Sequence, residues 1–411
     1  MRGPLTGRAS SCAACALAAA VLVAQSAIGA GPAPDLAAPR GEEQGTGFSQ
    51  VLEPREFEFP RDHGPHPGFR QEWWYLTGNL DAAAGERFGF ELTFFRFALA
   101  PHSATGPAPS GGASRWRTRQ IYMAHFAITD VARRQFRFTQ KLARDALGLA
   151  GAQGSPLRIW IDDWSLACAA PAARWSARAA GSGYELALEA QPLLPPILNG
   201  VNGLSRKSRE ADAASYYYSM PRVAVRGRLV RDGRPIEVHG LAWIDREWGS
   251  GTLGLSEQGW DWFALQLKDG STLMFYALRD RDGSHDPYSA GTWVDAAGRS
   301  RALSLNDVRI DVGGYWRNAR GARYPARWHL NVPAVALDVD VRPVLADQEL
   351  GTTPRYWEGA VDVTGTLAGQ KTGGRGYVEL VGYAGAAGSA AAVRRADMPA
   401  RLVGASGHGL K

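Results

Sequence analysis

Short segments in which apolar and polar residues alternate recur along almost the whole chain. In RFGFELTFFRFAL (87–99), large apolar residues occupy the even positions from 88 to 94, and RVAVRGRLV (222–230) has the same two-residue period. This alternation is typical of strands with one buried face, and the Gly, Pro, Asn and Asp residues between the segments indicate turns. Helical periodicity is limited to a short stretch near 206–215. The sequence therefore predicts an all-β protein built as a sandwich or barrel.

The length of the chain predicts two such barrels in tandem. With 411 residues, the chain exceeds the usual size of a single domain. We expect two antiparallel β-barrels that pack against each other, one formed by 51–255 and one by 256–390. A flexible leader rich in Pro, Gly and Ala at 31–50 and a tail at 391–411 would flank them.

The first 30 residues have the layout of a secretory signal peptide. Arg2 and Arg8 precede the apolar run CAACALAAAVLVA, and the small residues of QSAIGAG follow it. Because the run is too short for a stable membrane span, we expect removal of 1–30 and export to the periplasm. Retention as an uncleaved anchor is the alternative. No later segment is long and apolar enough to predict a transmembrane span in the mature chain.

Cysteine usage and charge exclude several classes of protein. Removal of the signal peptide takes away Cys12 and Cys15 and leaves Cys168, so no internal disulfide is expected and Cys168 is predicted to be a small buried residue. The formal net charge is +6, but the basic residues are scattered arginines, so no nucleic-acid partner is expected. The sequence also lacks a phosphate loop, a dinucleotide fingerprint and a nucleophile elbow, and we expect no cofactor.

One hairpin can be placed in register from the sequence. The segments EWWYLTGNL and RFGFELTFFR flank the turn DAAAGE, and pairing Leu80 with Phe88 puts Glu72 opposite Arg96. Trp74 would lie on the same apolar side. Burying a charged side chain is costly unless an opposite charge contacts it. We therefore predict that Glu72 and Arg96 pair with each other at the end of an apolar wall and have a structural or site role.

Acidic residues lie among tryptophans in two neighbouring segments, GLAWIDREWGSGTL (240–253) and QGWDWFALQL (258–267). On an extended strand, Asp245 and Glu247 share one face and Arg246 lies on the other. A carboxyl group on an apolar face has a raised pKa unless a cation pairs with it. We expect both segments to converge in one polar cluster, with Asp245 or Asp261 either protonating an alkene or pairing with Arg246 in a structural network. The tryptophans of this cluster would be Trp243, Trp248, Trp260 and Trp262.

Four further groups are candidates for the site. His63 and His66 lie three apart in a Gly- and Pro-rich loop, but no other ligands are evident, so no metal site is expected and turn residues at a barrel mouth are favoured. His125 has apolar neighbours on its face and is expected to be buried and hydrogen-bonded. Tyr217 would line a ligand mouth or fill the gap between the domains. Glu379 is predicted to be an inward, paired acid.

Several motifs occur together in an order that resembles one family. They are HGPHPGFRQEWWYLTGNL, FELTFFRFAL, IYMAHFAITD, YYYSMPR, GLAWIDREWGS, GWDWFALQL and GRGYVELVGY, which extend from His63 to Tyr383. Together they resemble the exported, lipocalin-like AttH-like family, which is grouped with carotenoid 1,2-hydratases. The resemblance implies two lipocalin-like barrels in tandem and association with an ABC-type permease. For the hydratase branch it implies addition of water to the end of a carotene.

The resemblance to the hydratase branch has one departure. That branch has an Asp-His-x-Trp motif where this chain has Asp245, Arg246, Glu247 and Trp248 in succession. The acid and the tryptophan match, but an arginine stays protonated and cannot shuttle a proton at ordinary pH. The histidine's role in proton transfer therefore has no counterpart at this position.

Two functions follow as hypotheses. The first is a periplasmic lipocalin-like protein that binds a hydrophobic or amphipathic molecule, such as a lipid or isoprenoid, for an ABC-type permease. The second is a hydratase-like enzyme that adds water to a terminal alkene of an isoprenoid. Turnover of an alkene would distinguish the enzyme from the binding protein.

Overall fold

The computed structural model of the chain describes residues 47–101, 118–169, 174–251 and 257–384. The predicted signal peptide, the leader up to residue 46 and the tail lie outside these residues. Residues 40–411 belong to one compact unit, which contains both sheets described below. In the described ranges, no helix has the length and apolar character that a membrane span requires.

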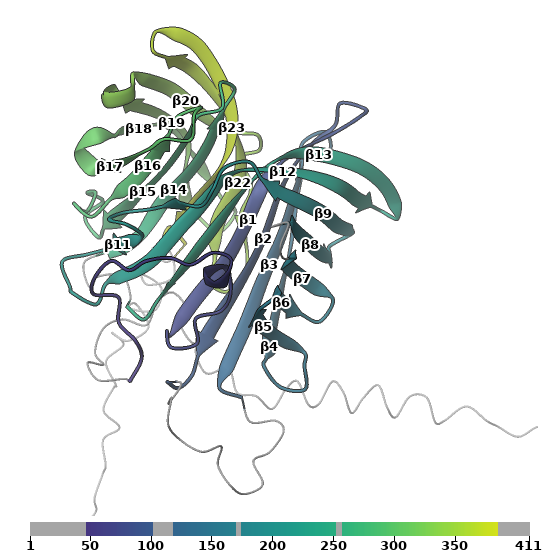
Figure 1. Cartoon of the computed structure of the whole chain (residues 1–411). Coiled ribbons are helices and arrows are strands. Elements are labelled where there is room, and N and C mark those ends of the chain that lie inside the picture. Colours follow the sequence, from purple (N-terminus) through teal and green to yellow (C-terminus); the bar gives the residue numbers. More distant parts are fainter. Residues whose placement is uncertain (1–46, 102–117, 170–173, 252–256, 385–411) are drawn as a thin grey trace, which may run out of the picture. The chain divides into compact units, whose positions relative to one another are not determined.

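The first sheet uses the chain between 71 and 249 and curls into a nearly closed barrel (Figure 1). Its 13 strands in the described residues run in the order β4-β3-β2-β1-β13-β12-β9-β8-β7-β6-β5, and β10 and β11 both pair with β12. The strands are β1 (Gln71–Ala82), β2 (Arg87–Ala98), β3 (Gln120–Asp130), β4 (Gln135–Arg144), β5 (Ala150–Gly154), β6 (Leu157–Ile161), β7 (Trp164–Ala169), β8 (Arg174–Gly181), β9 (Tyr184–Pro192), β10 (Ile197–Leu198), β11 (Leu204–Arg206), β12 (Ala214–Arg231) and β13 (Arg234–Gly249).

The second sheet uses the chain between 257 and 381 and curls into a half-barrel. Its 10 strands in the described residues run in the order β17-β16-β15-β14-β23-β22-β20-β19-β18, with β21 paired to β22. The strands are β14 (Glu257–Leu267), β15 (Thr272–Asp280), β16 (Ala290–Val294), β17 (Ser300–Ser304), β18 (Arg309–Arg317), β19 (Arg323–Val332), β20 (Leu337–Pro343), β21 (Glu349–Leu350), β22 (Tyr356–Leu367) and β23 (Gln370–Val381).

The predicted fold class, all-β with two antiparallel barrels in tandem, is confirmed, with one sheet forming a nearly closed barrel and the other a half-barrel. The helices in the described part of the chain are short 3-10 turns, η1 (Arg61–His63), η2 (Leu305–Asp307) and η3 (Pro333–Val335). The helical stretch expected near 206–215 is wrong, since β11 ends at Arg206 and β12 begins at Ala214 with turns between them.

The register predicted for the first hairpin is confirmed. In the β1–β2 pair, Leu80 lies opposite Phe88 and Glu72 lies opposite Arg96. The apolar face of this hairpin, which includes Trp74, points into the first barrel and is fully buried. The turn, the alternation and the pairing sum were therefore sufficient to place these two charges across from each other.

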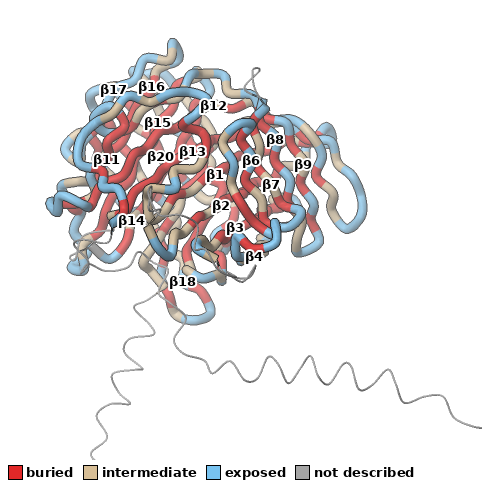
Figure 2. Tube along the Cα trace, turned by 60° about the horizontal axis from the view of Figure 1, so that its bottom comes forward, coloured by how far each residue is buried: buried red, intermediate tan, exposed pale blue. Residues whose placement is uncertain are grey.

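The central strands are buried on both faces, which the alternating pattern alone did not indicate. Figure 2 shows buried residues along β1, β2, β13 and β14, and the turns between strands are exposed. One face lines a barrel interior and the other packs against the other sheet. Contacts between the sheets include Asn79 Nδ2 donating to the carbonyl of Gly376 at 3.1 Å and Gln266 Nε2 donating to that of Ala242 at 2.9 Å. The polar residues of the outward faces are therefore interface residues.

Cys168 in β7 gives a direct test of the packing of the first barrel. Its side chain is buried, and burial raises the pKa of its thiol to about 11. Because the thiolate is the reacting form, we expect little reaction with a disulfide reagent at about pH 8 in the folded protein and full reaction after denaturation. A chain carrying Cys12→Ser and Cys15→Ser isolates this thiol. Rapid reaction of the native protein would contradict the described packing of β7.

Candidate functional site

The charged side chains of strand β13 lie on its two opposite faces. Asp245 and Glu247 lie on the face toward the second sheet, and Arg246 and Trp248 lie inside the first barrel. Asp261 lies on the inner face of the second sheet, paired with Arg279. The predicted convergence of these charges in one cluster is therefore wrong, as is the pairing of Arg246 with Asp245 or Asp261. Successive strand residues point to opposite faces, so one cluster cannot receive both Asp245 and Arg246.

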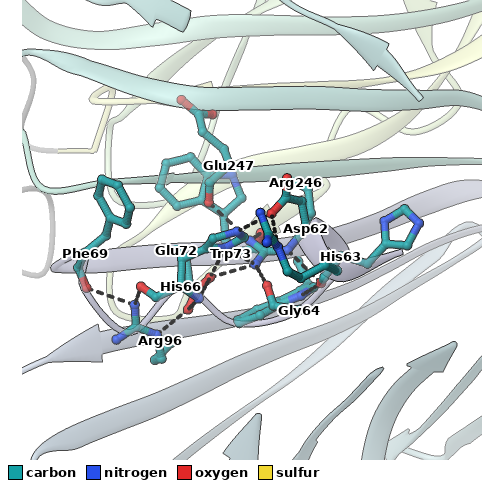
Figure 3. Close-up of polar contacts among 12 residues, drawn as sticks. Asp62, His63, Gly64, His66, Phe69, Glu72, Trp73, Arg96, Arg246 and Glu247 are labelled. Atoms are coloured by element: carbon teal, nitrogen blue, oxygen red, sulfur yellow. Dashed lines mark hydrogen bonds and ion pairs between the residues drawn. The ribbon is translucent and has the colours of Figure 1, made fainter. Parts of the chain in front are cut away.

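Inside the first barrel, two arginines share one glutamate (Figure 3). Arg246 Nη2 lies 2.6 Å from Glu72 Oε2, and Arg96 Nε contacts Glu72 Oε1. All three side chains are completely buried. Burial by itself would raise the pKa of Glu72, but the guanidinium groups of Arg96 and Arg246 hold it well below its usual range. Glu72 is therefore an ionised structural acid.

The same arginines hold the loop that precedes β1. Arg246 Nη2 donates to the carbonyl of Gly64 at 2.5 Å, and Arg96 Nη2 donates to the carbonyls of His66 and Phe69 at 3.0 and 2.9 Å. The ring of His66 stacks on Trp248 with centroids 3.8 Å apart, and the Arg246 guanidinium lies 3.8 Å from the centroid of the ring of Trp74. The cluster thus ties this loop to the barrel interior.

A cleft of about 250 Å³ lies over this loop. It is lined by Arg55, Arg61, Asp62, Pro65, His66, Pro67, Gly68 and Phe69. Asp62 is buried and bonded to Arg55, and His63 Nδ1 lies 2.6 Å from Tyr218 OH, so these polar groups are already paired. Among the described residues, no group of three or more His, Cys, Asp or Glu side chains is arranged to hold a metal ion.

Asp261 is an ion-paired acid on the inner face of the second sheet. Arg279 Nε donates to Asp261 Oδ1 at 2.9 Å, and Tyr383 OH donates to the same carboxyl at 2.9 and 3.1 Å. Burial raises its pKa, and Arg279 and Tyr383 oppose the rise. Its neighbours Trp260 and Trp262 point to the opposite face. With a cation at hydrogen-bond distance, Asp261 is suited to a structural role.

Asp245 lies between the sheets and is held by neutral donors. Tyr217 OH donates to Asp245 Oδ2 at 2.5 Å, while Ser219 Oγ and Trp243 Nε1 both donate to Oδ1 at 2.6 Å. Trp262 Nε1, from the second sheet, donates to Tyr217 OH at 3.1 Å. Burial raises the pKa of Asp245 to about 7, against the lowering effect of its three donors, and no described cation contacts it.

The second sheet presents another acid to the same layer. The β14–β23 and β22–β23 registers place Trp262, Glu379 and Glu358 side by side on the face toward the first sheet. Trp260 Nε1 lies 3.3 Å from Glu379 Oε2. Burial, followed by the charges of Glu91, Glu247 and Asp245, raises the pKa of Glu379 to about 8. Glu379 is inward, as predicted, but its described partner is an indole N–H and not a cation.

Two further acids lie deeper in the layer. Tyr75 OH donates to Glu358 Oε1 at 2.5 Å, and Tyr356 OH donates to Glu91 Oε1 at 2.9 Å. Burial raises the pKa of Glu91 to about 7. His125 is buried and hydrogen-bonded, as predicted, with Nδ1 2.6 Å from Tyr356 OH, and burial lowers its pKa to about 3.

Glu247 differs from these acids because it has a cation. Lys207 Nζ lies 3.0 Å from Glu247 Oε1, and Ser215 Oγ contacts the same oxygen. The Lys207 ammonium also lies over the rings of Tyr217 and Tyr276, 5.1 and 4.0 Å from their centroids. Glu247 therefore neutralises a cation at the edge of the layer, and Tyr217 fills the space between the sheets.

Sequence reasoning did not identify Glu91, Glu358 or Lys207. Glu91 is at an odd position of RFGFELTFFRFAL, opposite the apolar face, and the two-residue period does not indicate that this face packs on a second sheet. The one available clue is that outward positions next to Glu91 and Glu358 carry aromatic or small residues in place of charges.

Taken together, Asp245, Glu379, Glu91 and Glu358 form an inter-sheet acid layer whose members lack described cation contacts. Carboxyl groups of this kind keep a protonated fraction near neutral pH and can donate a proton to a bound apolar molecule. Indole and phenol rings surround them, since Trp262 lies edge-on to Tyr75 at 5.2 Å and to Trp243 at 6.2 Å between ring centroids. We take this layer as the candidate functional site.

Comparison with known proteins identifies similar chains. The AttH-like family model matches residues 50–383. The crystal structure of an AttH protein from Nitrosomonas europaea is 36% identical, covers 82% of this chain and 100% of its own, and has a TM-score of 0.73. Kievitone hydratase from Nectria haematococca has the same fold at 12% identity, with a TM-score of 0.60, covering 84% of this chain and 97% of its own. The comparison with curated proteins gave no match.

Proposed function

Because this chain belongs to the AttH-like family, we propose that it is a hydratase-type enzyme that adds water to a carbon–carbon double bond of an apolar substrate bound at the inter-sheet acid layer. The observation that carries the proposal is the environment of Asp245 and Glu379. Asp245 is buried and Glu379 is half-buried between the sheets. Both have raised pKa values, both accept hydrogen bonds from indole N–H groups, and neither has a described cation partner.

The chemistry requires a neutral acid in apolar surroundings. A carboxylic acid transfers its proton to one alkene carbon, which leaves a carbocation at the other carbon and a carboxylate on the protein. A water molecule then bonds to the cation, and its surplus proton goes to a carboxylate. The faces of Trp243, Trp260 and Trp262 supply electron density beside the transient cation. An acid with a pKa near the working pH is the efficient donor, which fits Asp245 and Glu379.

The arginine that departs from the hydratase motif does not oppose this proposal. Arg246 lies on the opposite face of β13 from Asp245 and is bound to Glu72 inside the barrel. Proton transfer at the acid layer therefore does not pass through this position. Kievitone hydratase has the same fold, which supports hydration as a reaction that this fold can accommodate.

Hydration of acyclic carotenes and terpenes by the purified full chain tests the proposal. We expect Asp245→Asn and Glu379→Gln to lower the rate of hydration by about 10²–10⁴-fold, the usual contribution of a general acid. Glu237→Gln, on the exposed end of β13, is the matched control and should keep the wild-type rate. Wild-type protein without hydration activity, or both variants with unchanged rates, would contradict the proposal.

Carriage of an apolar molecule is the second candidate. Trp73, Trp260 and Tyr288 pack at the edge of the acid layer and remain partly exposed, as contacts for an apolar ligand would be. In this case the exported protein would deliver a lipid or isoprenoid to an ABC-type permease. Binding of the same carotenes and terpenes without turnover, unchanged in Asp245→Asn, would favour carriage over catalysis.

A further inference from the structure

At the centre of the acid layer, two carboxyl groups each leave one oxygen without a partner. Glu91 Oε1 accepts from Thr93 Oγ1 and Tyr356 OH, both at 2.9 Å, and Glu358 Oε1 accepts from Tyr75 OH at 2.5 Å. Within the described residues, the Oε2 atoms of both side chains are buried and have no hydrogen-bond partner. A buried carboxylate oxygen without a donor is costly, and a proton on that oxygen removes the charge.

The two groups belong to strands of different sheets that touch each other. Glu91 lies on β2 of the first sheet and Glu358 on β22 of the second, and these strands are in contact. Gly89, two residues before Glu91, is so close to β22 and β23 that a Cβ atom there would lie 2.7 Å from Ala360 Cβ and 2.9 Å from Tyr377 OH. This packing leaves little room for a counter-ion, so we expect protons to neutralise the two carboxyl groups.

The titratable groups that face this pair leave its negative charge uncompensated. They are Tyr75 from β1, His125 from β3, Tyr356 from β22, and Tyr377 and Glu379 from β23. The tyrosines and His125 are neutral, because burial raises the pKa values of the phenols and lowers that of the imidazole. Glu379 is itself an acid. Two ionised glutamates here would repel each other in a medium of low polarity.

We propose that Glu91 and Glu358 form a proton-storing pair in which Glu358 keeps its proton and Glu91 exchanges one. The contacts alone support the storage of protons by the pair. Its use in turnover rests on the proposed hydratase function, because in that reaction one group loses a proton to the alkene and another gains one from water. Glu379 is next to Glu358 in the β22–β23 register, so the pair lies beside the proposed donor and can accept or return that proton.

The hydrogen bonds around Glu91 have a consistent direction. Gln140 Nε2 lies 3.0 Å from His125 Nε2, which places the ring proton on Nδ1. His125 Nδ1 then donates to Tyr356 OH, and Tyr356 OH donates to Glu91. This series of hydrogen bonds keeps Glu91 Oε1 as an acceptor, so Oε2 is the atom that gains or loses the proton. Tyr356 and His125 are therefore positioning residues for the pair.

Infrared spectroscopy of the full chain tests the pair without an activity assay. The pKa of Glu91 is raised to about 7 and that of Glu379 to about 8, whereas burial and the charge of Glu91 raise that of Glu358 well above its usual range. At about pH 9, we therefore expect the carbonyl band of a protonated carboxylic acid to persist in the wild-type protein, after ordinary acids have ionised. Glu358→Gln should abolish this band.

A second variant tests whether the two glutamates act as a pair. Glu91→Gln removes the neighbouring charge, so the band of Glu358 should persist at neutral pH but disappear at a lower pH than in the wild type. Glu237→Gln is the surface control and should leave the band unchanged. Three results would overturn the proposal. They are the absence of the band from the wild-type protein at about pH 9, its persistence in Glu358→Gln, and a midpoint of its titration that Glu91→Gln does not shift.

The outcomes separate this inference from the proposed function. If the band behaves as expected and no alkene is hydrated, the proton-storing pair stands and the hydratase proposal fails. If alkenes are hydrated and the band is absent, the hydratase proposal stands and the pair is wrong. In an active protein, Glu91→Gln is expected to lower kcat with little change in KM, because the pair exchanges protons and does not bind the substrate.

Discussion

Replacing Arg246 with alanine is expected to lower the free energy of unfolding by about 3–5 kcal/mol, the usual cost of breaking a buried ion pair on one side. The Arg246 guanidinium is completely buried and donates to Glu72 Oε2 and to the carbonyl of Gly64. Its removal leaves Glu72 with Arg96 as its remaining guanidinium partner and orphans the carbonyl that holds the loop before β1. The loss also removes the guanidinium from the ring of Trp74.

Urea denaturation at equilibrium, followed by tryptophan fluorescence, measures this loss. The matched control is Arg226→Ala. Arg226 forms an ion pair with Glu189 on the surface, where the two side chains are 74% and 64% exposed. An exposed pair contributes little, so the control should change the unfolding free energy by less than about 1 kcal/mol. Equal effects of the two substitutions would show that the Glu72 cluster is not a buried network.

Raising the pH from about 5 to about 8 is expected to destabilise the protein strongly. The folded-state pKa values of Asp245 and Glu91 are raised to about 7 and that of Glu379 to about 8, from ordinary values of 3.8 and 4.5. Between these limits the folded protein binds more protons than the unfolded chain. Each acid then lowers the unfolding free energy by about 1.4 kcal/mol per pH unit, and the loss is complete once its folded-state pKa is passed.

Unfolding free energies measured across this range test the prediction, and Glu379→Gln is the informative variant. Removing this titration should flatten the decline between about pH 5 and 8, whereas Glu237→Gln should leave it unchanged. At lower pH the sign reverses, since the pKa of Glu72 is held below its usual range and its contribution is lost as the pH falls below its unfolded-state value of 4.5. Stability that rises steadily toward pH 8 would contradict the raised pKa values.

The sequence alone determined those features that depend on neighbouring residues and on the two-residue period. Alternation identified the strands, the turn DAAAGE set the register, and the pairing rule then placed Glu72 opposite Arg96. The same period also separates Asp245 from Arg246, because adjacent side chains of a strand cannot lie on one face. The prediction that Asp245, Arg246 and Asp261 would meet in one cluster was wrong. It relied on the density of tryptophans in the two segments, whereas the alternation of side chains along β13 already separates Asp245 from Arg246.

The tertiary structure decided which face of each strand is internal and which partner it meets. Glu72 receives Arg246 because β1 pairs with β13 across a long stretch of sequence, a choice that local pattern does not encode. Glu91 and Glu358 are candidate site residues only because the outward faces of β2 and β22 pack together, which removes both carboxyl groups from water. Their pKa values depend on that burial, so the acid layer exists only in the assembled pair of sheets.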